Sequence, residues 1–322
     1  MEENGKEGVV LSVCMLAYNH EKWISKSIEG VLMQKTNFKY QLIIAEDCSN
    51  DGTRDIILSY SKMYPDLIGV LFNNNNLGLA QNFSQALTIC KGKYIAICEG
   101  DDFWTDPDKL QRQIDFLDVN HNCIIVSHNA ARYYEERGRE NKTVKYDHSF
   151  PFDQKRFLEE WLTQPVTCVF RNIFSDYTYF NRDLDIFCDV ILFYELLKHG
   201  YGYFMPETMA TFRVHKNALS SGLSRFQWLF NHIVMYDYLF KYNSRDKLLQ
   251  KMSRNYCLSI YIYNLTNGKE ARNNFKPLKE YLKRNPGILE QIIVFSLKVP
   301  YYILKYRFYL RSTSSREPSI LL

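Results

Sequence analysis

Short apolar runs alternate with amphipathic segments over the first hundred residues of the chain. Continuous apolar runs predict buried strands, and apolar positions at helical spacing predict helices. The predicted strands cover residues 9–16, 40–45, 69–72 and 94–98, and the predicted helices cover residues 21–34, 56–63 and 79–90. Alternating strands and helices with short connections are typical of βαβ units in a parallel sheet. We therefore predict an α/β fold whose polar turns, one after each strand, face a common crevice.

The second half of the chain shows a weaker pattern. We predict strands at residues 124–128, 166–171, 203–204 and 209–214, and helices at residues 157–162 and 189–199. Gly200 is predicted to end the second of these helices as a C-cap glycine. The charged segment 132–148 is predicted to be a surface excursion. Beyond residue 226 the chain looks entirely helical, without strand-like alternation.

Composition narrows the function classes. The 322 residues are 46% hydrophobic and 24% charged, as in an ordinary globular protein. The net charge of +4 is too small to indicate nucleic-acid binding, and there is no basic helix, zinc spacing or RNP-like motif. Eight cysteines are scattered without a CxxC pair, which favours reduced, buried thiols in a cytosolic protein. We expect neither a signal peptide nor a transmembrane helix, because the N-terminus is polar and no apolar stretch reaches about 18 residues.

The most informative stretch follows the fourth predicted strand. Glu99, Asp101 and Asp102 place three carboxylates within four residues, with Gly100 between them. Clustered carboxylates repel each other, and burying them is costly unless a divalent cation is bound. Such a cation can hold a diphosphate at the same time. In open α/β sheets, ligands bind at this end of the strands. The alternative is an exposed acidic turn before a helix.

Three motifs occur in order at fitting distances: residues 13–19 (VCMLAYN), residues 46–53 (EDCSNDGT) and residues 99–102 (EGDD). With them, the chain resembles the family-2 glycosyltransferases over roughly residues 9–215. The resemblance implies the GT-A nucleotide-sugar-binding fold, a Rossmann-like and mostly parallel sheet flanked by helices. A helical C-terminal extension would follow this domain.

The resemblance also implies a donor site. Tyr18 would stack on the base, and Asp47 would accept the imide N–H of uracil. The alternatives are that Tyr18 is a half-buried turn residue and that Asn76 only caps a helix. We interpret residues 51–53 as a turn followed by a helix cap. The predicted donor-binding residues are Ala17, Tyr18, Asn19, Glu46, Asp47, Asn76, Asn82, Glu99, Gly100, Asp101 and Arg213.

A metal site for Mn²⁺ or Mg²⁺ follows from the same resemblance. Residues 99–101 stand where the family carries Asp-x-Asp, but the first carboxylate is Glu99, which leaves its ribose contact in question. Asp101 and Asp102 are the predicted ligands. Residues 212–215 (FRVH) resemble the family's Tyr-Arg-x-His, so His215 is a further predicted ligand, and Arg213 would neutralise phosphate. The alternative is that His215 is structural.

Asp189 is the predicted catalytic base. An inverting transfer needs a carboxylate that takes the proton from the acceptor hydroxyl. Asp189 opens a predicted helix, and its segment resembles the family's Gly-Asp-x-x-Leu stretch, whose aspartate is the expected base. The alternative is a helix N-cap, a common use of Asp. Glu195, further along the helix, is predicted to form a salt bridge.

The C-terminal segment carries nine Lys or Arg and three Asp or Glu from residue 276 onward, beside many apolar and aromatic residues. This excess of six positive charges is typical of a helix on an anionic membrane surface. A helix packed on the catalytic domain with a solvated basic face is an equal alternative. Pro300 would kink a single long helix.

Together these observations predict a metal-dependent inverting glycosyltransferase in bacterial cell-surface polysaccharide synthesis. It would transfer a sugar from a UDP-sugar to a glycan or lipid-linked acceptor, in the cytoplasm or on the inner face of the plasma membrane. The catalytic domain would cover residues 9–225, with a nucleotide-sugar half at 9–118 and an acceptor half at 119–225, and a helical region would cover 226–322. The alternatives are an inactive nucleotide-sugar-binding scaffold and a nucleotidyltransferase on a related fold, although the latter would need a glycine-rich, basic loop after the first strand.

Overall fold

The structure is a computed structural model, and it describes most of the first 259 residues. The described residues are 8–141, 146–160, 162–175, 177, 188–218, 221, 223–242, 246–247, 249, 251–252, 255–256 and 259. The basic C-terminal segment from residue 276 onward lies outside them. The chain divides into two compact units, Met1–Lys216 and Asn217–Leu322. In the second unit, the helix α7 (Arg225–Tyr242) is consistent with the predicted helical character.

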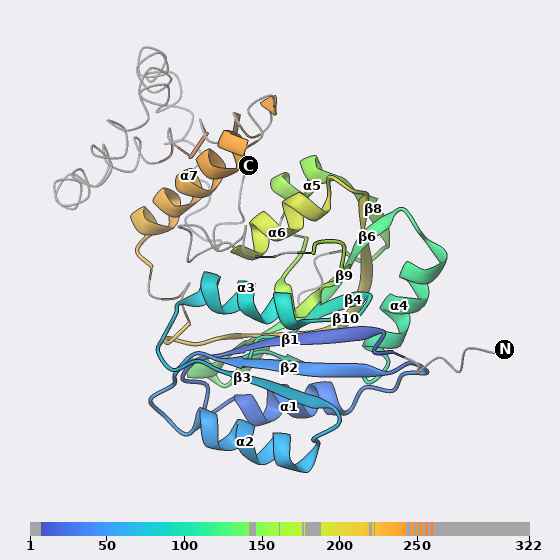
Figure 1. Cartoon of the computed structure of the whole chain (residues 1–322). Helices are drawn as coiled ribbons and strands as arrows, with labels where there is room; N and C mark the ends of the chain where they lie inside the picture. The colour runs from blue at the N-terminus through green and yellow to red at the C-terminus, as the bar shows by residue number, and fades with distance from the viewer. Residues whose placement is uncertain are drawn as a thin grey trace. The chain divides into compact units, whose positions relative to one another are not determined.

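The first four strands form the parallel sheet that the sequence predicts, in the order β3-β2-β1-β4. They alternate with three helices. The bounds are β1 (Leu11–Ala17), α1 (Ile24–Leu32), β2 (Tyr40–Glu46), α2 (Thr53–Met63), β3 (Ile68–Phe72), α3 (Leu79–Ile89) and β4 (Tyr94–Ile97). All seven residues of β1 are buried, as expected for a central strand covered on both faces. Figure 1 shows α1 and α2 on one face of these strands and α3 on the other.

The sheet continues beyond β4 as a mixed sheet in the order β4-β9-β6-β10-β5. The further elements are β5 (Phe103–Trp104), α4 (Lys109–Val119), β6 (Cys123–Tyr134), β7 (Arg139–Asn141), β8 (Phe150–Phe152), α5 (Gln154–Glu159), β9 (Val169–Arg171), α6 (Cys188–Leu196) and β10 (Tyr201–Val214). Strand β9 is antiparallel to both β4 and β6, so β6 and its parallel neighbour β10 run in the same direction as β4. The carboxyl ends of β1, β4, β6 and β10 therefore lie at one edge.

Two strand predictions need correction. The predicted short strands at 203–204 and 209–214 are one strand, β10, whose register shifts between Met205 and Ala210. Pro206 lies in this irregular part, and a proline has no N–H to donate to a neighbouring strand. The segment 132–148 was predicted to be a surface excursion, but β6 extends to Tyr134 and β7 pairs back onto it. Among the described residues of this segment, 135–141 are exposed, and the backbone of β7 is paired with β6.

The prediction of Gly200 as a C-cap glycine is wrong. Helix α6 ends at Leu196, and the described glycines with positive φ are Gly78 and Gly138. Gly200 is instead required by a close approach of the backbone, because a Cβ atom there would lie 2.3 Å from the carbonyl oxygen of Asn122. The sequence shows a glycine at this position, but the backbone contact that requires it is visible only in the structure.

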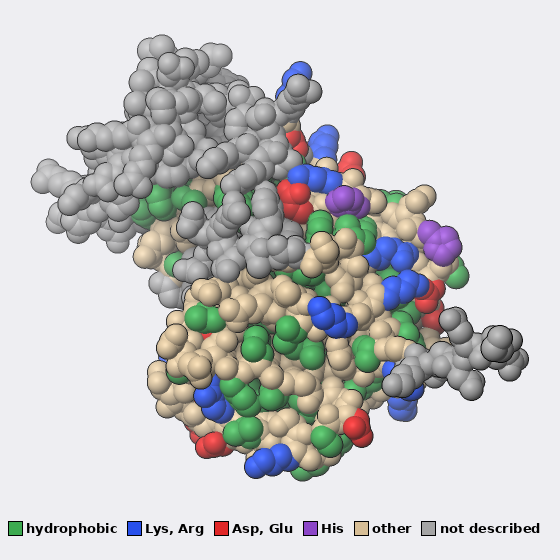
Figure 2. Space-filling view, in the orientation of Figure 1, with side chains coloured by type: hydrophobic (Ala, Val, Ile, Leu, Met, Phe, Trp, Pro, Cys, Tyr) green, Lys and Arg blue, Asp and Glu red, His purple; other side chains and the backbone are tan. Residues whose placement is uncertain are grey.

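The described cysteines are free thiols, as predicted, and all except the half-buried Cys48 are buried. Among the described residues, no helix is long and apolar enough to span a membrane. On the face shown in Figure 2, the described Lys and Arg side chains lie scattered among hydrophobic and uncharged ones. That distribution agrees with the small net charge and gives no sign of a basic binding surface on this face.

Candidate active site

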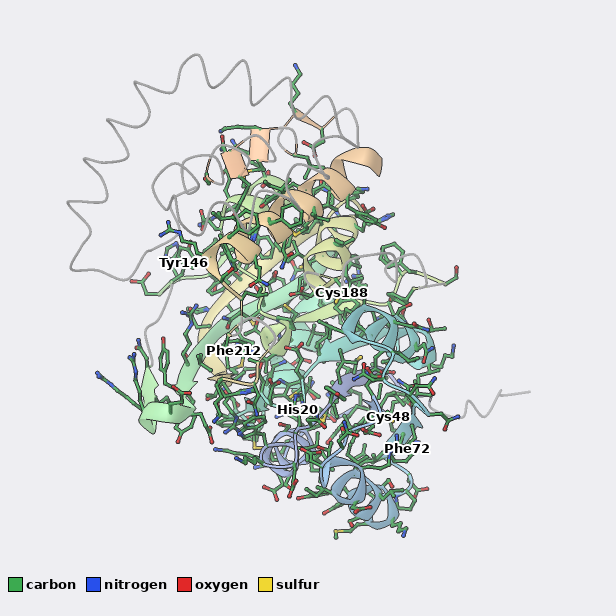
Figure 3. The ribbon with its side chains drawn as sticks, turned by 90° about the vertical axis from the view of Figure 1, so that its left-hand side faces the viewer. His20, Cys48, Phe72, Tyr146, Cys188 and Phe212 are labelled. Atoms are coloured by element: carbon green, nitrogen blue, oxygen red, sulfur yellow. The ribbon has the colours of Figure 1, made fainter. Side chains whose placement is uncertain are left out.

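The predicted site residues of the first half gather at the carboxyl edge of the sheet. Figure 3 looks onto this edge, where His20, Cys48 and Phe72 mark the ends of β1, β2 and β3, and Phe212 lies near the end of β10. Strands β2 and β4 flank β1 on opposite sides. The connection from β1 leads to β2, whereas β4 comes later in the chain, so a topological switch lies between β1 and β4. Such a switch is where open α/β sheets bind ligands.

The turn after β1 is fixed by hydrogen bonds to the loop after β2. Asn19 has a φ of 56°, a left-handed conformation that Asn tolerates better than most residues. Its backbone N–H donates to Ser49 Oγ, and its side-chain oxygen accepts from the N–H of Asn50. Tyr18 projects from this turn with 40% of its surface exposed, and Ala17 is buried behind it. The tyrosine ring is thus available to stack on a ligand.

Asp47 is the centre of a buried hydrogen-bond network. Its Oδ1 accepts from Asn73 Nδ2 and from the backbone N–H of Leu77, both at 2.9 Å, and its Oδ2 accepts from the N–H of Gly78 at 3.0 Å. Asn82 joins the network through its Oδ1, which accepts from Asn73 Nδ2. Asp47 therefore fixes the loop before α3, and one acceptor position on its Oδ2 is not used by these bonds.

Two other predicted donor-binding residues have structural partners. Glu46 is fully buried and forms an ion pair with Arg54 Nη2 at 2.5 Å, and it also accepts the N–H of Ser49. Asn76 is exposed, and its side chain accepts the N–H of Gly78, the N-cap residue of α3. The interpretation of residues 51–53 as a turn and helix cap is confirmed, because the Asp51 carboxylate accepts from both the N–H and the hydroxyl of Thr53.

The acidic cluster lies directly after β4. Carboxylate oxygens of Glu99, Asp101 and Asp102 all lie within 4.8 Å of one another. Burial, followed by the charges of Asp101 and Asp189, raises the pKa of Glu99 to about 8. Burial and the neighbouring carboxylates also raise the pKa of Asp102 well above its usual value. These raised pKa values indicate that the cluster concentrates negative charge in a poorly solvated place.

Gly100 allows this cluster to form. A Cβ atom at this position would lie 2.7 Å from His20 Nδ1 and 2.9 Å from the carbonyl oxygen of Leu16. The backbone N–H of Gly100 donates to that same Leu16 oxygen, and its carbonyl accepts from Ser27 Oγ. The glycine thus brings the cluster against the end of β1 and the start of α1, where a side chain would not fit.

Asp101 is held by two histidines. His215 Nε2 lies 3.0 Å from Asp101 Oδ2 and donates to it, and His20 Nε2 lies 3.9 Å from the same oxygen. Burial opposes ionisation of Asp101, but the two imidazoles outweigh it and hold the pKa of this carboxyl below its usual value. The His215 ring packs against Trp23 in a tilted arrangement, with centroids 3.9 Å apart. The structure therefore brings the predicted ligands Asp101 and His215 into direct contact.

Asp102 is held from the other side by Arg213. The backbone N–H of Arg213 donates to Asp102 Oδ1, and Arg213 Nε donates to the carbonyl oxygen of Asp101 at 2.7 Å. The guanidinium also forms an ion pair with Glu135 at 3.2 Å. Asp102 Oδ2 is buried and has no hydrogen-bond partner in the described part of the chain. A buried carboxylate oxygen without a donor is a natural ligand for a cation.

The cluster fits a hard divalent cation. Three carboxylates converge, and one of their oxygens has no hydrogen-bond partner among the described residues. Burial, followed by repulsion between the carboxylates, raises the pKa of Glu99 and of Asp102, and a bound cation would offset both effects. Oxygen donors of this kind suit Mg²⁺ and Mn²⁺. Glu99, Asp101 and Asp102 are therefore the residues that would hold the ion.

Asp189 lies in the first turn of α6, at a half-buried position. Burial raises the pKa of Asp189 to about 6, although a hydrogen bond from the backbone N–H of Val190 partly opposes the shift. Its charge contributes to the raised pKa of Glu99, so the two carboxylates interact electrostatically. Glu195 pairs with Lys198, which lies two residues beyond the end of the helix, so the predicted salt bridge is present. A carboxyl with a pKa near neutrality beside an acidic cluster is a candidate proton acceptor.

The sequence analysis missed His20. A single histidine in a turn gives no periodic signal, and its relation to Asp101 depends on β1 and β4 being neighbours. The signal that could have found it is its place in the turn after the first predicted strand, because that strand is predicted to lie in the same sheet as the strand before the acidic cluster. The structure places its Nε2 3.9 Å from Asp101 Oδ2.

Comparison with known proteins identifies the family. The model of "Glycosyl transferase family 2" matches residues 12–179. Rv1520 of Mycobacterium tuberculosis, an uncharacterised protein, is 30% identical over 212 residues, which are 65% of this chain and 60% of Rv1520. The match thus leaves two fifths of that relative unaligned.

A second relative has a named activity. WfaP of Escherichia coli, a "UDP-Glc:alpha-D-GlcNAc-diphosphoundecaprenol beta-1,3-glucosyltransferase", is 34% identical over 128 residues, which are 40% of this chain and 47% of WfaP. Among solved structures, TarS of S. aureus in complex with UDP superposes with a TM-score of 0.55 at 15% identity, covering 81% of this chain and 74% of that one. The similarity to TarS bears out the predicted GT-A fold, a sheet flanked by helices.

Proposed function

Because the chain belongs to glycosyl transferase family 2, we propose that it is an inverting glycosyltransferase with a UDP-sugar donor. The acceptor would be a hydroxyl of a glycan or lipid-linked sugar in bacterial cell-surface polysaccharide synthesis. WfaP, whose name states a UDP-glucose donor and a diphosphoundecaprenol-linked acceptor, supports both parts of this proposal. The two alternatives, a scaffold and a nucleotidyltransferase, have less support, because the acidic cluster, Asp189 and His215 are all present.

The observation that carries the proposal is the convergence of Glu99, Asp101 and Asp102 directly after β4. The cluster would hold the diphosphate through Mn²⁺ or Mg²⁺, which would offset the charge that develops on the leaving group. Asp189 would take the proton of the acceptor hydroxyl while the oxygen of that hydroxyl forms a bond to the anomeric carbon of the sugar. The bond from that carbon to the diphosphate breaks on the opposite face, so the configuration is inverted.

The hydrogen bonds of Asp47 favour uracil over guanine. Three of the roughly four acceptor positions of this carboxylate are used by Asn73, Leu77 and Gly78. One position remains on Oδ2, which matches the single imide N–H of uracil. Guanine presents two neighbouring donors on the equivalent edge and would need two acceptor positions. The exposed ring of Tyr18 would stack on the base.

A product-release screen tests the proposed function. The full-length protein would be incubated with UDP-sugars and GDP-sugars, with Mn²⁺, with Mg²⁺ and with EDTA, and the released nucleoside diphosphate would be measured. We expect release of UDP, from at least one UDP-sugar, that depends on the added cation. Release of GDP alone, or UDP release that is unaffected by EDTA, would contradict the proposal.

We further propose that the catalytic part is residues 9–225 and that the basic C-terminal segment binds an anionic membrane surface. The six excess positive charges from residue 276 onward support the second part. Sedimentation with phosphatidylserine vesicles tests it. The protein should bind at low salt and be partly released at high salt, and a variant ending at Asn285 should lose this binding. No binding at low salt would leave the packed-helix alternative.

A further inference from the structure

His20 is held in place more firmly than a turn residue requires. Its backbone N–H donates to Thr53 Oγ1 at 2.7 Å, and its carbonyl accepts the N–H groups of Trp23 and Ile24 at the start of α1. Its ring packs against Gly100, where a Cβ atom would lie 2.7 Å from Nδ1. Contacts with three separate segments therefore fix both the backbone and the ring. Such fixed side chains are expected at binding sites, where geometry has to be set in advance.

The ring has one buried nitrogen and one that faces the acidic cluster. Nδ1 is buried and finds no hydrogen-bond partner among the described residues. A proton on Nδ1 would be a buried donor without an acceptor, which native structures avoid more strictly than an unpaired acceptor. The proton therefore belongs on Nε2, which makes Nε2 a donor directed toward Asp101 Oδ2. At 3.9 Å that oxygen is too far for a hydrogen bond.

The position of this donor indicates its acceptor. His20 is two residues from Tyr18, which would stack on the base, and its Nε2 lies 3.9 Å from Oδ2 of Asp101, which would ligate the cation. A nucleoside diphosphate bound at both places has its phosphates between them. The His20 side chain is 17% exposed, so a ligand can reach it. Asp101 Oδ2 accepts from His215, so the N–H of His20 remains available to a ligand.

We propose that His20 Nε2–H donates a hydrogen bond to a phosphate oxygen of the nucleoside diphosphate. This inference rests on the proposed function, because it assumes that a UDP-sugar binds with its base at Tyr18 and its diphosphate at the acidic cluster. It assigns a role in diphosphate binding to a residue outside the three motifs from which the site was predicted.

Binding measurements on two His20 variants test the inference. His20→Phe keeps a flat ring against Gly100 but lacks a donor, whereas His20→Gln keeps an N–H donor. The affinities of UDP and of uridine would be measured by calorimetry or ligand-observed NMR in Mn²⁺, with His121→Phe, a change at an exposed turn, as the control. Melting temperatures would establish that each variant is folded.

A hydrogen bond to a charged group contributes about 1.5–3 kcal/mol, so His20→Phe should bind UDP about 10- to 100-fold more weakly. His20→Gln should retain most of the affinity, and uridine binding should be unchanged in every variant. Equal loss of uridine and UDP binding would show that His20 only shapes the turn, which overturns the inference. If His20→Phe binds UDP as tightly as the wild type, the inference about His20 is also overturned, but the proposed UDP site is not contradicted. If the wild-type protein binds no UDP in Mn²⁺, the inference about His20 and the proposed UDP-sugar donor are both contradicted.

Discussion

The backbone N–H of Arg213 donates a hydrogen bond to Asp102 Oδ1 over 2.8 Å, between residues 111 positions apart in the sequence. This bond joins the end of β10 to the acidic cluster after β4. It uses one oxygen of Asp102 and leaves the other buried without a partner among the described residues. Strand β5 makes the connection possible, because Phe103 and Trp104 pair with Thr211 and Ala210 of β10. Both halves of the sheet therefore hold the cluster in place.

The first prediction concerns the cation. Asp101→Ala should lower cation-dependent UDP release by about 10²-fold or more, because a bound cation contributes several kcal/mol of charge stabilisation. Mn²⁺ in the presence of UDP should raise the melting temperature of the wild type but not of the variant. Asp115→Ala, at an exposed position on α4, is the control and should behave like the wild type. Full activity of Asp101→Ala would remove the cation from the proposed mechanism.

The second prediction concerns the proposed base. Asp189→Asn keeps the size and hydrogen-bonding ability of the side chain but cannot take a proton, so the rate should fall by about 10²–10⁴-fold. UDP affinity should persist, because the predicted contacts with UDP lie mainly in residues 9–118. Glu195→Gln on the same helix removes a carboxylate that pairs with Lys198, and its rate should stay close to that of the wild type. If Asp189→Asn turns over like the wild type, the proton acceptor is another group.

The third prediction concerns the pH dependence of the transfer. Burial raises the pKa of Asp189 to about 6, and the base acts only when it is ionised. The fraction of ionised Asp189 falls as the pH drops through 6, so kcat/KM should fall about tenfold per pH unit below that value. Rates would be measured between pH 4.5 and 8 over a range in which the protein remains folded by circular dichroism. A flat profile down to pH 5 would contradict the assignment.

The sequence predicted the first half of the fold well because each βαβ unit is a local pattern. Strands β1 to β4 depend on apolar runs within a few residues, and the polar turns that follow them meet wherever such strands are parallel. By contrast, the partners of Asp101 are His20 and His215, and this contact depends on pairing between distant strands. The single strand β10 was divided in the prediction because Pro206 interrupts its pattern. Gly200 was assigned a cap because sequence shows a glycine but not the backbone that approaches it.

Candidate site residues could be named from the motifs, but their partners could not. Asp47 and Glu46 are adjacent acids in one motif, yet Glu46 is neutralised by Arg54 while Asp47 orders the loop before α3. Nothing in the sequence distinguishes these two environments, since both acids follow the same predicted strand, residues 40–45. The difference arises from the alternation of side chains at the end of β2 and from the position of α2.

The last prediction concerns Lys109, a fully buried lysine at the start of α4. Its Nζ donates to Gln113 Oε1 at 2.8 Å and lies 4.2 Å from the centre of the Trp104 ring. Burial lowers the pKa of Lys109 from 10.5 to about 7. Between these two values the unfolded chain binds more protons than the folded protein, so the free energy of unfolding should rise with pH. Below about pH 7 both states carry the charge, and the folded protein bears the full cost of burying it.

Lys109→Met removes the titrating group while filling a similar volume. Near pH 8–9.5, the free energy of unfolding of the wild type should rise relative to that of the variant by about 1.4 kcal/mol per pH unit. Urea denaturation at several pH values measures this difference. The variant also leaves Gln113 Oε1 without the donor that Lys109 supplies, which changes stability at every pH. The dependence of the free energy of unfolding on pH is therefore the informative quantity, and a single value at one pH is not. Parallel pH dependences in the two proteins would show that Lys109 keeps its proton when buried, held by Gln113 and the face of Trp104.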